Sequence, residues 1–288
     1  MDIQANLLYS RPNFVAKPYG WIQHIPFAFF LIEKLKPTIF VELGTHSGNS
    51  YFSFCQAVEE LKIATKCYAV DTWEGDEHAS FYDKNVFKRV KSINDEHFNR
   101  VSSLLKMTFD DALAYFNDQT VDLLHIDGLH TYEAVKHDFD TWLPKLSKQG
   151  VVIFHDTNVR DRGFGVWKFW EELREKYISF DFVHGNGLGV LCVGDTVDED
   201  FVSFCKEANH NPYYRNFFST LGNRILLYQE LDDTRKELEL NKSEIKKREN
   251  ELEIREKFIS KRNEEYEKLK KDTESFIKII RENDKVIA

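Results

Sequence analysis

Over the first two thirds of the chain, short continuous apolar runs alternate with amphipathic stretches. Five runs have the length and composition of strands buried on both faces: residues 38–44, 66–72, 101–106, 121–127 and 150–156. Stretches with helical periodicity lie between and after them, at residues 49–61, 109–116, 132–146 and 165–177. This alternation predicts an α/β fold, with a mostly parallel sheet covered by helices on both faces.

Residues 180–194 show a different pattern. Two apolar runs flank Gly185, Asn186 and Gly187, which favours a hairpin. We therefore expect two antiparallel strands at one edge of the sheet.

The composition changes after Gly222. All 13 glycines and all six prolines lie at or before this residue. The 66 residues after it hold 17 Lys+Arg and 17 Asp+Glu together with leucine and isoleucine. Loss of the turn formers and retention of good helix formers predict one continuous helix over residues 223–288.

An apolar stripe with a seven-residue period runs along this predicted helix: Leu231, Leu238, Ile245, Leu252, Ile259, Tyr266, Thr273 and Ile280. The second heptad series is mostly polar: Thr234, Asn241, Arg248, Arg255, Arg262, Leu269 and Phe276. The stripe predicts a coiled coil that joins copies of the chain into a parallel dimer or trimer. A single helix held by charge pairs four residues apart is the alternative.

Charge and cysteine usage narrow the function classes. The net charge of -9 falls entirely on residues 1–222, which argues against a nucleic-acid partner. The four cysteines form no metal-binding spacing and are expected to be reduced thiols in a cytoplasmic protein. The N-terminus lacks the pattern of a signal peptide, and no apolar run reaches the roughly 18 residues of a membrane span.

The turn after the first predicted strand carries candidate ligand contacts. Gly44 and Gly48 permit a tight turn and a close approach of the backbone to a ligand, at the start of a predicted helix. His46 takes the middle glycine position of the dinucleotide fingerprint, so that motif is absent. An ordinary strand-to-helix turn is the alternative.

Asp71 ends the second predicted strand, 27 residues after Gly44. A carboxylate at this place accepts hydrogen bonds from ribose hydroxyls in nucleoside-binding sheets, so the two features predict an adenosine-type ligand. A helix cap or turn is the alternative for Asp71. Trp73 and His78 are expected to line the site, with a core position as the alternative for Trp73. His24 is expected either to close over the site or to be a structural histidine.

Polar residues also follow the fourth and fifth predicted strands. Asp127 and His130 follow the fourth, and Asp156 and Asn158 follow the fifth. Oxygen ligands at adjacent strand ends can bind a divalent cation, and His130 can act as a general base. The alternatives are hydrogen bonds to loop N–H groups for the carboxylates and a capping or packing role for His130.

Four segments together resemble a bacterial branch of the class I S-adenosylmethionine-dependent methyltransferases: HIPFAFFLIEKLKPTIFVELGTHSGNSYFSF, YAVDTWEGDEHASFY, LLHIDGLHTYEAVKHDF and GVVIFHDTNVRDRGFGVWKFW. Members of that branch are associated with glycosyltransferases and surface-polysaccharide synthesis. The resemblance covers about residues 20–195. It implies a Rossmann-like, doubly wound, seven-stranded sheet in a methyltransferase domain over 37–195. A helical cap (1–36) would precede this domain, and a helical connector (196–222) would lead from it to the coiled-coil helix (223–288).

The resemblance also implies roles for single residues. S-adenosylmethionine is expected to contact Glu42, Gly44, Thr45, Gly48, Ser50, Asp71, Thr72, Trp73 and Asp127. His130 would be the catalytic base, acting beside Asp127. Metal-dependent relatives hold Mg²⁺ or another divalent cation, here expected on Asp127 and Asp156. Two positions depart from their pattern: His155 replaces a second carboxylate, and Asn158 is shifted by one residue.

The expected activity is O-methylation of a sugar hydroxyl in a cell-surface polysaccharide or its precursor. Two alternatives stay open: a non-catalytic assembly protein of a polysaccharide machine, and a small-molecule O-methyltransferase of secondary metabolism. Relatives often continue into glycosyltransferase modules, and the last helix has no stop signal. We therefore expect glycosyltransferases as partners and the sequence as a fragment of a longer protein.

Overall fold

A computed structural model describes residues 5–76, 80–83 and 85–287 of the chain. Contacts divide the chain into two units, Met1–Gln229 and Glu230–Ala288. All candidate site residues belong to unit 1.

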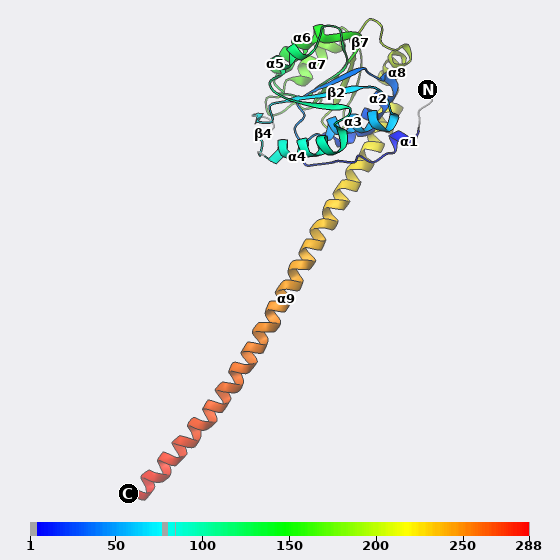
Figure 1. Cartoon of the computed structure of the whole chain (residues 1–288). Helices are drawn as coiled ribbons and strands as arrows, with labels where there is room; N and C mark the ends of the chain where they lie inside the picture. The colour runs from blue at the N-terminus through cyan, green and yellow to red at the C-terminus, as the bar shows by residue number, and fades with distance from the viewer. Residues whose placement is uncertain (1–4, 77–79, 84, 288) are drawn as a thin grey trace. The chain divides into compact units, whose positions relative to one another are not determined.

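Unit 1 is built on a seven-stranded sheet with the order β5-β2-β1-β6-β7-β9-β8. Figure 1 shows this sheet with helices packed around it. Its strands are β1 (Ile39–Leu43), β2 (Lys66–Asp71), β5 (Ser102–Lys106), β6 (Val121–Ile126), β7 (Leu146–His155), β8 (Ile178–Phe182) and β9 (Leu188–Cys192). The first five run parallel, and β9 lies antiparallel between β7 and β8. The predicted doubly wound, mostly parallel sheet of seven strands and its edge hairpin are confirmed.

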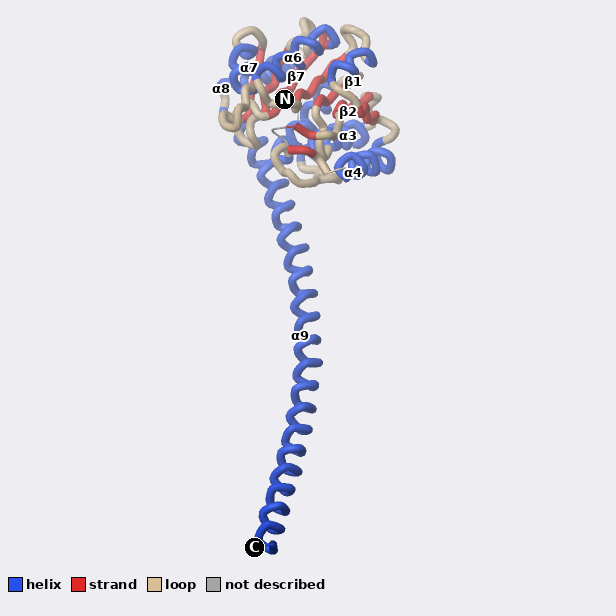
Figure 2. The backbone as a smooth tube through the Cα atoms, turned by 90° about the vertical axis from the view of Figure 1, so that its left-hand side faces the viewer, coloured by secondary structure: helices blue, strands red, loops and turns tan. Residues whose placement is uncertain are grey.

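Helices cover both faces of this sheet, as Figure 2 shows. One hydrophobic core contains side chains of α1 (Ala5–Leu8), α2 (Ile25–Leu35), α3 (Asn49–Leu61), α4 (Asn85–Ile93) and α8 (Glu199–His210). The other contains side chains of α5 (Phe109–Ala112), α6 (Tyr132–Trp142) and α7 (Val166–Arg174). Short 3₁₀ turns cover Ile22–His24, Leu113–Tyr115 and Leu143–Lys145, and a π-helical turn covers Asn94–Phe98. The near-continuous apolar sequence of α2 is explained by its burial on almost every side.

Two details of the sheet differ from the sequence prediction. The helix predicted to reach residue 146 ends at Trp142, because Pro144 supplies no N–H and a 3₁₀ turn follows. β7 then begins at Leu146, before the predicted residue 150. A second, two-stranded sheet, formed by β3 (Gly75–Asp76) and β4 (Ser80–Phe81), has no counterpart among the predicted strands.

The long helix α9 spans Pro212–Ile287 and therefore starts before the predicted residue 223. Gly222 lies inside it, where a Cβ atom would sit 2.0 Å from the carbonyl oxygen of Gln23. Gly222 thus permits a close helix contact and does not end the globular part. Phe218, Leu221 and Ile225 of α9 are buried in the core of unit 1.

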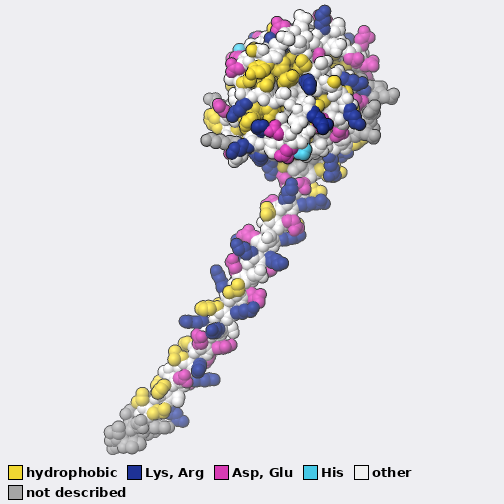
Figure 3. All heavy atoms as spheres, in the orientation of Figure 1, with side chains coloured by type: hydrophobic (Ala, Val, Ile, Leu, Met, Phe, Trp, Pro, Cys, Tyr) yellow, Lys and Arg dark blue, Asp and Glu magenta, His cyan; other side chains and the backbone are white. Residues whose placement is uncertain are grey.

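Unit 2 consists of the rest of α9, and over residues 231–280 its side chains are exposed apart from the half-buried Asp233. Hydrophobic side chains recur among charged ones along its surface (Figure 3). Its ion pairs join residues three or four apart, such as Glu244 and Arg248 or Glu253 and Lys257. Across the part of the chain that the structure describes, no helix has the length and apolarity needed to cross a membrane.

Candidate active site

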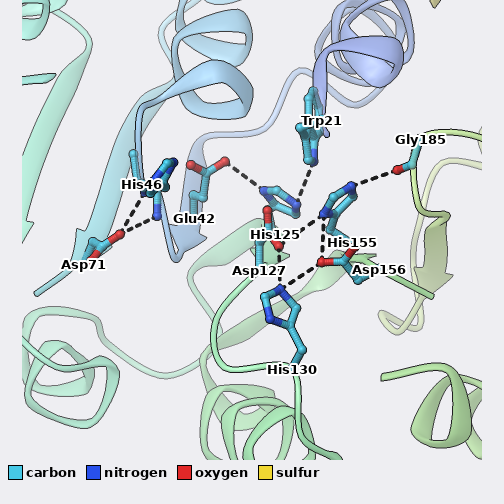
Figure 4. Close-up of polar contacts among 11 residues, drawn as sticks. Trp21, Glu42, His46, Asp71, His125, Asp127, His130, His155, Asp156 and Gly185 are labelled. Atoms are coloured by element: carbon cyan, nitrogen blue, oxygen red, sulfur yellow. Dashed lines mark hydrogen bonds and ion pairs between the residues drawn. The ribbon is translucent and has the colours of Figure 1, made fainter. Parts of the chain in front are cut away.

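The carboxyl ends of the central parallel strands bring the candidate residues together (Figure 4). The Gly44 turn follows β1, Asp71 is the last residue of β2, Asp127 follows β6, and His155 ends β7. Parallel sheets bind ligands outside these strand ends. The sheet topology therefore brings these candidate residues to one edge of the sheet.

Both turn glycines have backbone conformations that suit glycine. Gly44 has φ +87°, and a Cβ atom there would lie 2.1 Å from the carbonyl oxygen of Asp127. Gly48 has φ +86° and caps α3, and a Cβ atom there would lie 2.5 Å from the ring of Phe52. Any side chain at Gly44 would therefore push the β1 and β6 strand ends apart before it reached a ligand.

The Asp71 carboxylate ties two loops together. Its Oδ2 accepts hydrogen bonds from the backbone N–H groups of Thr45 and His46, both at 2.9 Å. Its Oδ1 accepts the N–H of Trp73 at 2.6 Å. A carboxylate has about four acceptor positions, so these bonds leave about one for a ligand.

Two adjoining cavities open at this edge. The first, of about 240 Å³, is lined by Asp127, His130, His155 and Asp156 together with Thr45 and Ser50 of the Gly44 turn. The second, of about 210 Å³, is lined by Asp71, Thr72 and Phe109. Gly44, Tyr82 and Asp127 line both cavities. Each is smaller than the roughly 300–1,000 Å³ typical of ligand sites, so a ligand of ordinary size would extend through both.

Two histidines and two carboxylates form a compact cluster in the first cavity. His130 Nε2 lies 2.8 Å from Asp156 Oδ2 and 3.5 Å from Asp127 Oδ1. His155 Nδ1 lies 3.3 Å from each of the same two oxygens. His155 Nε2 donates to the carbonyl oxygen of Gly185, at 3.0 Å. All of these partners are acceptors, an arrangement that favours an imidazole with hydrogen on both nitrogens.

The charges in this cluster compensate one another. Burial opposes the charged form of His130, but hydrogen bonds to Asp127 and Asp156 raise its pKa to about 9. Burial likewise opposes charge on His155, and the carboxylates Asp156 and Asp127 raise its pKa well above the usual value. Burial alone would raise the pKa of both carboxyls, but the histidines lower it well below the usual range. Without another ion, the cluster has no net charge at neutral pH.

A hydrogen-bonded chain of buried polar side chains lies next to the first cavity. Trp21 Nε1 donates to His125 Nε2 at 3.3 Å, and His125 Nδ1 then donates to Glu42 Oε2 at 2.8 Å. Burial raises the pKa of Glu42, and bonds from His125 and Ser50 oppose that rise. Glu42, predicted to contact the donor, is thus enclosed by protein and lines neither of the two cavities.

Three other candidate residues make contacts within the protein. Trp73 is buried in the core, packs on Phe87 and donates its Nε1–H to the carbonyl oxygen of His46. His24 is fully buried and bonds to Gly185. The Asn158 amide donates to the carbonyl oxygen of Val183. His78 lies outside the described residues.

The sequence analysis did not predict the hydrogen-bonded side chains that surround the site. Trp21, His125 and the charged role of His155 were not predicted. His125 did leave a signal, because it is a polar residue near the end of an otherwise apolar strand segment, VDLLHI. A buried histidine of this kind needs a hydrogen-bonding partner.

The strand order and a family match define the class of this region. Counted in chain order, the sheet reads 3-2-1-4-5-7-6, which is a doubly wound order with an added hairpin strand. Residues 41–157 match the family model described as a methyltransferase domain. This segment contains all the predicted donor and metal residues. The segment is therefore similar to methyltransferase domains.

Three known proteins show how this chain relates to others. Protein y4gI of Sinorhizobium fredii (strain NBRC 101917 / NGR234), described as uncharacterized, is 49% identical over 194 residues, which are 67% of this chain and 21% of that protein. Protein R132 of Acanthamoeba polyphaga mimivirus, also described as uncharacterized, is 25% identical over 171 residues, covering 54% of this chain and 71% of that protein. The solved O-methyltransferase TomG of Streptomyces achromogenes, involved in tomaymycin synthesis and bound to SAM, is 15% identical with a TM-score of 0.45. That match covers 63% of this chain and 82% of that one. The chain therefore spans about a fifth of the length of y4gI.

Proposed function

We propose that this chain transfers the methyl group of S-adenosylmethionine to a hydroxyl of a sugar in a cell-surface polysaccharide or its precursor. The observation that carries the proposal is the pair of adjoining cavities at the strand ends. One is lined by a ribose-type acceptor, Asp71, and the other by a histidine–carboxylate cluster.

The second cavity has the chemistry of an adenosine site. Asp71 retains acceptor capacity for a ribose hydroxyl, and Thr72 adds a hydroxyl. Phe109 offers an aromatic face for a base. The methionine part of the donor would then run past Gly44 and the Thr45 hydroxyl, which is buried and has no hydrogen-bonding partner in the structure.

The first cavity suits the acceptor. Methyl transfer forms a carbon–oxygen bond and breaks the carbon–sulfur bond, so the sulfonium becomes a neutral thioether and the hydroxyl proton must leave. The enzyme mainly aligns the two reactants, because the donor is already activated. His130 lines this cavity beside Asp156, and in its neutral form it would take up that proton.

The donor set also fits a divalent cation, as expected for Asp127 and Asp156. Asp156 is 5% exposed, and its Oδ1 has no hydrogen-bonding partner in the structure. An oxygen in that position can accept a cation without first losing a bond. A bound cation would lower the pKa of the acceptor hydroxyl.

The sugar acceptor and the glycosyltransferase partners rest on the sequence resemblance. Arg162, at the wall of the first cavity, supports an acceptor that carries a phosphate, such as a nucleotide sugar. Incubation with labelled S-adenosylmethionine and separate panels of nucleotide sugars, free sugars and catechols tests the acceptor class. Transfer to catechols alone would favour the secondary-metabolism alternative.

Calorimetric titration with S-adenosylmethionine tests the donor site and separates the enzyme from a non-catalytic assembly protein. We expect wild type to bind and Asp71→Ala to bind about 10- to 150-fold more weakly, since a charge-assisted bond is worth about 1.5–3 kcal/mol. Asp118→Ala is the matched control, because Asp118 is exposed, pairs with Lys145 and lines neither cavity. Failure of wild type to bind would favour the assembly protein.

Asp71→Ala also removes three bonds that order the loops, so its melting temperature must be measured beside the titration. Asp71→Asn keeps the side-chain volume and an acceptor oxygen but loses the charge. If a fully folded Asp71→Ala binds the donor as wild type does, Asp71 does not hold the ribose.

A further inference from the structure

We propose that, with the cation bound, His130 is a metal ligand and not the general base, so that the site holds its cation through two carboxylates and one imidazole. This inference rests on the proposed function, because it concerns the same cavity. Its consequence is a preference for cations that accept nitrogen, such as Mn²⁺, Fe²⁺, Co²⁺ or Zn²⁺, over Mg²⁺.

The geometry of three atoms carries the argument. One ligand atom each from Asp127, His130 and Asp156 lies within 4.8 Å of the other two, and Figure 4 shows the three side chains pointing toward one another. His130 Nε2 is 2.8 and 3.5 Å from the two carboxylate oxygens. Ligands bound about 2.1 Å from one metal ion are separated by about 3–3.4 Å in octahedral or tetrahedral geometry. One of the two observed distances lies just below that range, and the other lies just above it.

A second observation points independently to a ligand. Asp156 is more than nine-tenths buried and lines the first cavity, yet its Oδ1 has no hydrogen-bonding partner in the structure. Buried carboxylate oxygens are rarely left in this state. The oxygen near His130 is Oδ2, so a cation that Asp156 holds through both carboxylate oxygens would also give Oδ1 a partner.

The residue expected to supply a further oxygen ligand is directed elsewhere. The Asn158 side chain donates to Val183, and its backbone N–H donates to Asn186. His130 fills the gap. Its orientation is fixed by Phe164, whose ring stacks on the imidazole at 4.5 Å and 12°. The backbone carbonyl of His130 also accepts the N–H of Gly165, at 2.7 Å.

Measuring metal binding to the full chain without an acceptor tests this inference. Calorimetric titrations with Co²⁺ and with Mg²⁺ give two affinities, and the visible absorption of Co²⁺ reports its ligands. His130→Asn replaces the nitrogen ligand with an amide oxygen. We expect it to weaken Co²⁺ binding by about 10- to 100-fold and Mg²⁺ binding by less than about threefold, with a changed Co²⁺ spectrum.

His137→Ala is the matched control. His137 lies on the neighbouring helix α6, is exposed, and pairs with the carboxylate of Asp110 at 2.9 Å, but it lies outside the cavity. We expect its metal affinities and Co²⁺ spectrum to equal those of wild type.

Two results would overturn the inference: equal Co²⁺ affinity in wild type and His130→Asn, or no binding of either ion by wild type. Both leave the proposed function testable, because donor binding is measured in a separate titration. A loss of Co²⁺ and Mg²⁺ affinity by the same factor would also count against a nitrogen ligand. Melting curves of each variant show whether a loss reflects unfolding.

Discussion

The two units of this chain are stabilised in opposite ways. In unit 1, the bonds that build the site join residues far apart in sequence, such as Trp21 with His125 and His155 with Asp127. In the described part of unit 2, side-chain ion pairs join residues three or four apart. Unit 1 can therefore hold reactive groups at fixed distances, whereas unit 2 can offer only a repeating surface.

Burial shows the same difference. Phe40, Phe54 and Trp142 of unit 1 are fully buried, whereas Ile245 and Leu252 of unit 2 are each 57% exposed. A helix gains most of its stability from packing an apolar face. The exposed stripe of unit 2 thus supports the proposal that it packs against a second copy of the chain.

Deleting residues 230–288 should have the largest effect, because it removes the whole stripe. We expect the full chain to be a dimer or trimer at micromolar concentration and the truncated chain to be a monomer, measured by light scattering. Donor affinity should change by less than about twofold, since every proposed donor residue lies in unit 1. A monomeric full chain would leave unit 2 as a single helix stabilised by its charge pairs.

The sequence alone predicted those elements whose composition or hydrophobic pattern is regular along the chain. Apolar runs located the central strands β1, β6 and β7 because strands buried on both faces are largely apolar, whereas the edge strands β5 and β8 are partly exposed and carry polar residues. The loss of glycine and proline located the helix of unit 2. The start of α9 was predicted too late because Gly222 was interpreted as a turn residue. In the structure, the missing side chain of Gly222 lets the carbonyl group of Gln23 lie close to the helix.

The site was predictable in place but not in detail. Asp71, Asp127, His130 and Asp156 do gather at one edge of the sheet, since parallel strands bring their ends together. The sequence could not show that the Asp71 carboxylate accepts three hydrogen bonds from backbone N–H groups. Nor could it show that His130 points its Nε2 at two carboxylates. Such pairings depend on distances between loops, which no local pattern encodes.

Asp138 gives the next largest effect, through the pH dependence of unit 1. Burial raises the pKa of this carboxyl to about 7. Its folded pKa lies above its unfolded value of about 3.9, so the ionised form destabilises the fold. Wild type should therefore lose stability as pH rises from about 4 through about 7.

Asp138→Asn removes this loss and should be more stable than wild type by about 4 kcal/mol at pH 8, with little difference at pH 4. Urea unfolding at a series of pH values measures it. Asp140→Asn is the control, because Asp140 is exposed on the same helix and pairs with Lys136. A constant difference between Asp138→Asn and wild type at every pH would show that ionisation of Asp138 is not the cause.

Breaking one ion pair of unit 2 should have the smallest effect. Arg248 Nη2 lies 2.6 Å from Glu244 Oε1, and both side chains are largely exposed. Exposed pairs of this spacing contribute about 0.3–0.5 kcal/mol, so Arg248→Ala should shift the thermal midpoint of the helical circular dichroism signal only slightly. The neighbouring stripe residue Ile245 sharpens the test. If copies of the chain cover the stripe, Ile245→Asn places a polar group in the covered seam and should lower the midpoint far more than Arg248→Ala. If unit 2 is a single solvated helix, the two substitutions should have similarly small effects. The two units would then differ only in how far their side chains are buried.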